Sequence, residues 1–69
     1  MDMLQELKTL IREKMKVQKK YDELAEEAID PALEDFFKQR KNDELMQQKL
    51  LADKMNEILN DLEGATKHS

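Results

Sequence analysis

The sequence predicts an all-α protein: an antiparallel two-helix hairpin that we expect to dimerise into a four-helix bundle. Charged residues make up 41% of the 69 residues, and glycine and proline occur once each, a composition typical of long helices or coiled coils. Apolar residues recur at steps of three and four on both sides of Pro31. That proline follows an aspartate, which indicates that one helix ends and another begins there.

The first helix is predicted over residues 2–29. No glycine or proline interrupts this segment, so nothing in it breaks a helix. Leu4 and Ile11 lie beside the main apolar ladder and widen it into the stripe of a bundle helix. The ladder itself steps by four and then three residues: Met3, Leu7, Leu10, Lys14, Val17, Tyr21, Leu24 and Ala28.

The turn is predicted at Asp30 and Pro31. Asp30 can cap the free N–H groups of a new helix, and Pro31 suits the first helical position, where no donor is needed. A proline also disfavours the α conformation of the residue before it, so Asp30 should lie outside both helices. A single helix running through Pro31 would continue the first ladder onto mostly polar residues, which argues against a kinked rod.

The second helix is predicted over residues 31–63, with Phe36, Ala52 and Leu59 beside its ladder. We expect Phe36 to join Tyr21 and Phe37 in the core next to the turn, because an aromatic at helical spacing usually packs. The residues of this second ladder are Leu33, Phe37, Leu51, Met55, Ile58 and Leu62.

A polar run over residues 38–44 leaves two interpretations open. One is a break near Asn42, which would give a three-helix bundle; the other is a continuous helix. Folding the chain at Asp30 places residue i beside residue 61 − i, so Lys14 and Gln18 fall beside a polar group of the second helix: Asn42, Glu44 and Gln47. Matched polar layers can fix register and partner number, which favours the continuous helix.

Residues 1–63 are therefore expected to form a single domain. Gly64 resembles the glycine that commonly follows the end of a helix. We expect residues 64–69 to form a disordered tail.

The residue inventory argues against catalysis. The chain has no cysteine, and its one histidine and one serine lie in the last two positions. No nucleophile–base pair, phosphate-binding glycine loop, EF-hand or Glu-x-x-His metal motif can be assembled. We therefore predict no enzyme activity, no cofactor and no metal site.

The net charge is −4, and no apolar run approaches the ~18 residues of a membrane span. The first residues lack the basic and apolar segments of a secretory signal. We expect a cytoplasmic protein that does not bind membranes.

A two-helix hairpin covers only part of each apolar stripe, so something should cover the rest. The simplest cover is a second copy, and the other is a helical protein partner. We therefore predict a non-enzymatic protein-interaction module: an adaptor, inhibitor, chaperone or assembly factor. The predicted partner-binding residues are Leu4, Ile11, Met15, Met46, Leu50 and Leu59.

The alternative is a dimeric hairpin that binds RNA or DNA. Basic residues gather in the middle of the chain, although the net charge is acidic and no nucleic-acid-binding motif is present. The residues that would contact nucleic acid are Lys14, Lys16, Lys19, Lys20, Arg40 and Lys41.

Overall fold

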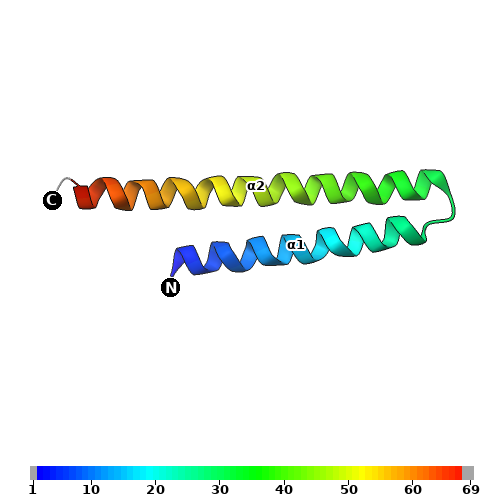
Figure 1. Cartoon of the computed structure of the whole chain (residues 1–69), viewed down its shortest axis with the longest axis horizontal. Helices are drawn as coiled ribbons and strands as arrows, with labels where there is room; N and C mark the ends of the chain where they lie inside the picture. The colour runs from blue at the N-terminus through cyan, green and yellow to red at the C-terminus, as the bar shows by residue number, and fades with distance from the viewer. Residues whose placement is uncertain (1, 68–69) are drawn as a thin grey trace.

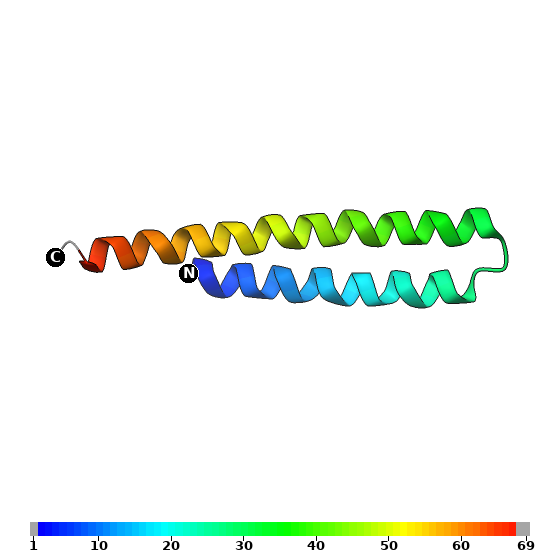
Figure 2. The ribbon, with the colours of Figure 1, turned by 45° about the horizontal axis from the view of Figure 1, so that its top comes forward.

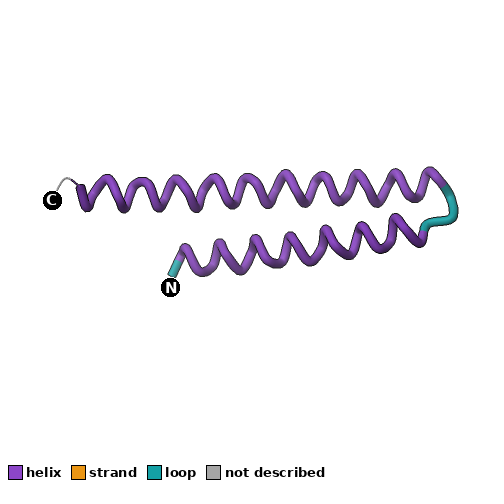
Figure 3. Tube along the Cα trace, viewed as in Figure 1, coloured by secondary structure: helices purple, strands orange, loops and turns teal. Residues whose placement is uncertain are grey.

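Two antiparallel helices joined by a short turn make up the structure (Figure 1). The computed structural model describes residues 2–67, and the side chains of residues 2–64. Helix α1 spans Met3–Glu27 and helix α2 spans Pro31–Lys67. The two helices lie side by side in both ribbon views (Figures 1 and 2), and a loop connects them (Figure 3). The predicted all-α hairpin is confirmed.

Helix α1 begins at an aspartate cap. The Asp2 carboxylate oxygen Oδ1 accepts hydrogen bonds from the backbone N–H groups of Leu4 at 3.1 Å and Gln5 at 3.3 Å. The first N–H groups of a helix have no partner within the helix, so this side chain satisfies two of them.

The turn between the helices follows the predicted chemistry. Ala28 leaves the helical conformation with φ −66° and ψ 127° and ends α1. Asp30 lies outside both helices, and its carboxylate oxygen Oδ1 accepts a hydrogen bond from the Ala32 N–H at 3.0 Å. The Asp30 carbonyl accepts a second one from the Glu34 N–H at 3.0 Å. Pro31, which has no N–H to satisfy, is the first residue of α2.

Helix α2 is continuous from Pro31 to Lys67. It has no break near Asn42, so the three-helix alternative is wrong. It also continues through Gly64, beyond the end predicted at residue 63. A glycine stop requires a left-handed backbone, and Gly64 does not have a positive φ. Of the tail predicted over 64–69, residues 64–67 are helical, and 68–69 lie outside the described residues.

The helices differ in length, at 25 residues for α1 and 37 for α2. The C-terminal part of α2 therefore continues past the start of α1 (Figures 1 and 2). The Cα trace measures 60 × 18 × 13 Å. The result is a narrow molecule in which each helix has only one neighbour.

The seam between the helices is defined by the side chains that the hairpin buries at least in part. They follow steps of three and four residues, the spacing of a coiled-coil core. In α1 they are Leu4, Leu7, Ile11, Lys14, Gln18, Tyr21, Leu24 and Ala25, and Ala28 follows directly after the helix. In α2 they are Glu34, Phe37, Lys41, Glu44, Gln48, Leu51, Ala52, Met55 and Ile58.

The phase of the predicted α1 ladder is wrong at alternate positions, whereas the predicted α2 ladder is correct at Phe37, Leu51, Met55 and Ile58. Leu4 and Ile11 lie in the seam, whereas Leu10 and Val17 are exposed, as is Leu33 in α2. A four–three ladder and a three–four ladder share every second position and differ by one residue at the others. The phase with Gln18 in the seam is the one found, because Gln18 there meets another amide of α2.

The register of the hairpin agrees closely with the prediction that residue i lies beside residue 61 − i. Lys14 contacts Glu44, and Gln18 contacts Gln48. In an antiparallel pair, these two contacts are displaced along the helix axis by similar amounts in opposite directions, so the true level lies midway between them. The midpoint of residues 14 and 18, residue 16 of α1, is therefore level with the midpoint of residues 44 and 48, residue 46 of α2.

Candidate protein-interaction surface

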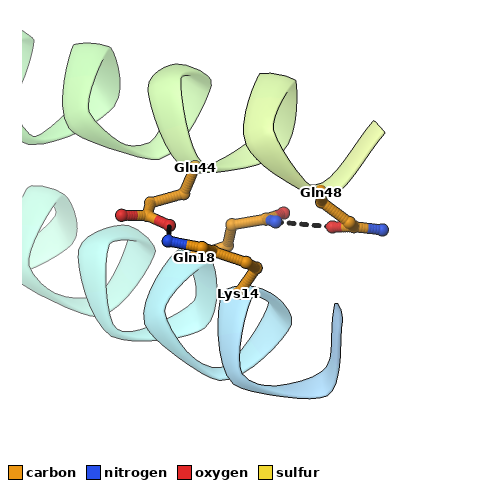
Figure 4. A network of polar contacts seen from close by, with 4 residues as sticks. All are labelled: Lys14, Gln18, Glu44 and Gln48. Carbon is orange, nitrogen blue, oxygen red and sulfur yellow. Dashed lines mark hydrogen bonds and ion pairs between the residues drawn. The ribbon is translucent and has the colours of Figure 1, made fainter. Parts of the chain in front are cut away.

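A polar layer lies at the middle of the seam (Figure 4). The Lys14 ammonium Nζ is 3.0 Å from the Glu44 carboxylate Oε2, and the Gln18 Nε2–H donates a hydrogen bond to Gln48 Oε1. Both charged side chains are largely shielded, with 29% of Lys14 and 20% of Glu44 exposed. Glu44 Oε2 accepts no hydrogen bond from any residue described, so its contact with Lys14 is ionic only.

This layer supports the predicted matched polar layer, with changed partners. Glu44 was expected beside Lys14 and Gln18, but Gln48 was not. Asn42 and Gln47, which were expected there, are both exposed. Because Lys14 meets Glu44 and Gln18 meets Gln48 in this alignment, the layer favours this register of the helices over shifted ones.

An aromatic group closes the seam next to the turn. The rings of Tyr21 and Phe37 stack with centroids 6.3 Å apart. Phe36 meets Phe37 edge to face at 5.5 Å, but it is itself exposed and lies 5.7 Å from the Arg40 guanidinium. Tyr21 and Phe37 thus pack as predicted, whereas Phe36 lies at the surface.

The core of the hairpin is thin. Among the described side chains, Leu7 and Ala25 are the only buried ones, at 7% and 8% exposed, and none is fully buried. Many large apolar side chains therefore stay in contact with water: Met3, Leu10, Met15, Val17, Ile29, Leu33, Phe36, Leu45, Met46, Leu50, Leu59 and Leu62.

Helical periodicity sorts most of these side chains into two groups, one toward each side of the seam, which approach each other on the outer side of α2. We call the first the Leu10 face. It contains a groove of about 350 Å³ lined by Leu10 and Lys14 of α1 and by Gln47, Leu50 and Leu51 of α2. The exposed apolar residues of this face are Met3, Leu10 and Val17 of α1 and Leu33, Phe36 and Leu50 of α2, and the half-buried Leu24 lies between this face and the seam.

The second face, which we call the Met46 face, consists of Met15 of α1 and Leu45, Met46 and Leu59 of α2. A groove of about 570 Å³ lies on it. The lining residues of that groove are Asn42, Leu45, Met46, Gln48 and Lys49.

The structure separates the six residues predicted to bind a partner. Leu4 and Ile11 lie in the seam, where the hairpin itself covers them in part. Leu50 lies on the Leu10 face. The remaining three, Met15, Met46 and Leu59, share the Met46 face.

Sequence reasoning missed several exposed positions, including Leu10 and Val17. It placed both inside the seam because the four–three phase contains more apolar residues than the correct one. The polar residues of α2 carried the signal that was needed, since Gln18 matches them at the same level and Val17 does not.

The predicted nucleic-acid residues do not form one basic surface. Four of them contact carboxylates: Lys14 and Glu44 at 3.0 Å, Lys20 and Glu23 at 3.9 Å, Arg40 and Asp43 at 2.7 Å, and Lys41 and Asp22 at 2.9 Å. Lys14 and Lys41 are in the seam. The two others, Lys16 and Lys19, are exposed on the outer side of α1.

An exposed ion pair on α2 affects one titration. Lys38 Nζ lies 2.8 Å from Glu34 Oε1, one helical turn away. The hydrogen bond to Glu34, together with the charge of that carboxylate, raises the pKa of Lys38 above its usual 10.5.

Within residues 2–67, no group of histidine, cysteine or acidic side chains is arranged to hold a metal ion. No helix in this range is both long and apolar enough to cross a membrane. The chain matches no family model, no curated protein and no solved structure. The two apolar faces are therefore the features from which a function is inferred.

Proposed function

We propose that this chain is a non-enzymatic protein-interaction module, an adaptor, inhibitor, chaperone or assembly factor, that binds a protein partner through an exposed helical face. The observation that carries this proposal is the Met46 face, where Met46 is 60% exposed and lines an open groove. Contiguous exposed apolar side chains commonly mark a protein-binding surface.

The chemistry of the Met46 face suits a helical partner. Methionine is flexible and polarisable, so Met15 and Met46 can adapt to different apolar side chains. Arg12 and Lys19, one turn before and after Met15, are exposed, and Lys49 lines the groove. An amphipathic helix with acidic residues at the edge of its apolar stripe would match both features.

The test compares two substitutions on α2. Leu50 and Met46 are 61% and 60% exposed and lie one turn apart, but Leu50 lines the groove of the Leu10 face and Met46 lines the groove of the Met46 face. In affinity capture from a native lysate, Met46→Glu should lose a protein that the wild type and Leu50→Glu retain in 0.5 M salt. Capture of the same proteins by wild type and Met46→Glu would refute the proposal.

Nucleic-acid binding is the alternative, and it predicts a different outcome of the same experiment. Nuclease-sensitive capture that falls steeply as salt rises, and that is unchanged by Met46→Glu, would favour it. The ion pairs of four of the six candidate residues give this alternative less support.

A further inference from the structure

We propose that the Leu10 face binds a second copy of this chain, face to face and antiparallel. This inference rests on the proposed function, because it assigns an occupant to one exposed helical face of the same hairpin. In the dimer, α1 packs on α1 of the second copy and α2 on α2. The twofold axis crosses α1 midway between Leu10 and Val17.

The apolar stripe of α1 is symmetric about that axis. Met3, Leu10, Val17 and Leu24 follow one another at intervals of seven residues, so they lie in one line along the helix. An antiparallel copy centred on the stripe places Leu10 against the second copy's Val17. It also places Met3 against the second copy's Leu24.

The charges of α2 on this face are symmetric as well. Arg40 and Glu57 are equidistant from a point between residues 48 and 49, and Asp43 and Lys54 are equidistant from the same point. An antiparallel copy centred there pairs Arg40 with the second copy's Glu57, and Lys54 with the second copy's Asp43. Leu50 lies next to the axis, where it meets the second copy's α2.

One axis serves both helices because the two centres are level. The crossed contacts of Lys14 with Glu44 and of Gln18 with Gln48 put residue 16 level with residue 46. In an antiparallel pair, the midpoint between residues 13 and 14 is then level with the midpoint between 48 and 49. The apolar stripe and the charge pairs thus specify the same position of the second copy.

The other symmetric arrangement lacks these matched charge pairs. With both turns at the same end, α1 of one copy would lie on α2 of the other at equal levels. Lys20 would then lie between Arg40 and Asp43 of the second copy, and Glu6 between Lys54 and Glu57. The antiparallel arrangement instead sets Arg40 and Lys54 directly against carboxylates, so charge pairing favours it.

The exposed area of the chain leaves room for such an interface. A compact monomer of this mass exposes roughly 4,500 Å², whereas this chain exposes 5668 Å². The excess of roughly 1,100 Å² is larger than the ~800 Å² that each partner buries in a standard interface.

Disulfide cross-linking tests the arrangement, because the chain has no cysteine of its own. A mixture of Leu10→Cys and Val17→Cys proteins should form a cross-linked heterodimer in an oxidising buffer. Either variant alone should not, because like residues are offset by ~10 Å along antiparallel helices and a disulfide needs Cβ atoms about 4 Å apart. Cross-linking of Leu10→Cys alone as readily as the mixture would overturn the proposed axis.

Charge reversal provides an independent test by analytical ultracentrifugation. Arg40→Glu should raise the dimer dissociation constant by about tenfold or more, because it places like charges against each other twice per dimer. Adding Glu57→Arg should restore dimerisation. The two residues are ~25 Å apart within one helix, so only contact between copies explains the restoration. Failure of Glu57→Arg to restore the dimer would count against the proposal.

Matched single substitutions separate this dimer from the proposed function. Leu50→Glu should make the protein monomeric with its helical circular dichroism retained, and Met46→Glu should remain dimeric. A wild-type chain that is monomeric at micromolar concentration by light scattering overturns the dimer. If Met46→Glu still abolishes capture in that case, the proposed function stands.

Discussion

At the scale of single residues, the hairpin depends on a few polar groups that the helices partly enclose. Lys14 and Glu44 are each more than two-thirds shielded from water. Removing one charge of such a pair leaves the other without compensation, whereas removing both does not. The pair thus contributes more to the choice of register than to the free energy of folding.

This asymmetry gives a prediction for urea unfolding. Lys14→Met should lower the free energy of unfolding by about 1–2 kcal/mol, because the shielded Glu44 carboxylate loses its only counter-charge. Lys14→Met with Glu44→Leu should return within about 1 kcal/mol of the wild type. Lys20→Met, which removes an exposed ion pair, should change stability by less than about 0.5 kcal/mol. Equal losses in the single and double variants would contradict this account.

A second prediction concerns the titration of Lys38. Its raised pKa means that the stabilisation from Glu34 is complete below pH 10.5 and is lost as pH rises through the folded-state value. In an NMR titration of the lysine side chains, Glu34→Gln should lower the pKa of Lys38. Circular dichroism should show that the helix persists in this variant. An unchanged Lys38 pKa would show that the ion pair does not form in solution.

At the scale of helices, the sequence was sufficient for the number of helices, their antiparallel order and the turn. Asp30 and Pro31 act locally, through capping and fixed backbone geometry, so their effect is visible in the sequence. The phase of the α1 ladder could not be read from the sequence, because residues 3, 10 and 17 are at least as apolar as the seam residues that follow them. The end of α2 was also misplaced, because Gly64 signals a stop only when its backbone turns left-handed.

The corrected phase predicts that shortening a leucine side chain to alanine has unequal effects on stability at neighbouring positions of α1. Leu7 is only 7% exposed, so Leu7→Ala should cost about 2–4 kcal/mol in the free energy of unfolding. Leu10→Ala should cost less than about 1 kcal/mol under conditions in which the chain is monomeric, because Leu10 stays in water within the hairpin. Comparable losses, measured by urea denaturation at low protein concentration, would argue for the four–three phase.

At the scale of the whole molecule, the hairpin folds a chain of this length into a particle about 60 Å long. An unbroken helix of 69 residues would reach ~100 Å. The proposed dimer adds mass beside the hairpin rather than at its ends, because its axis crosses near the middle. A doubled mass should therefore leave the length almost unchanged.

Small-angle X-ray scattering tests this relation between mass and length. The largest dimension should stay close to 60 Å across a concentration series while the mass from forward scattering rises toward that of two chains. The cross-section of the particle should grow over the same range. A maximum dimension near 100 Å would mean that the chain does not turn back at Asp30.

The polar layer also divides the seam into two apolar segments. One contains Leu7, Ile11 and Leu51, and the other contains Tyr21, Ala25 and Phe37. The polar side chains of Lys14, Gln18, Glu44 and Gln48 separate them, so each segment should open as a separate cooperative unit. In native-state hydrogen exchange, backbone amides of the two segments should show distinct protection factors, with a step in protection at the level of Lys14 and Gln48.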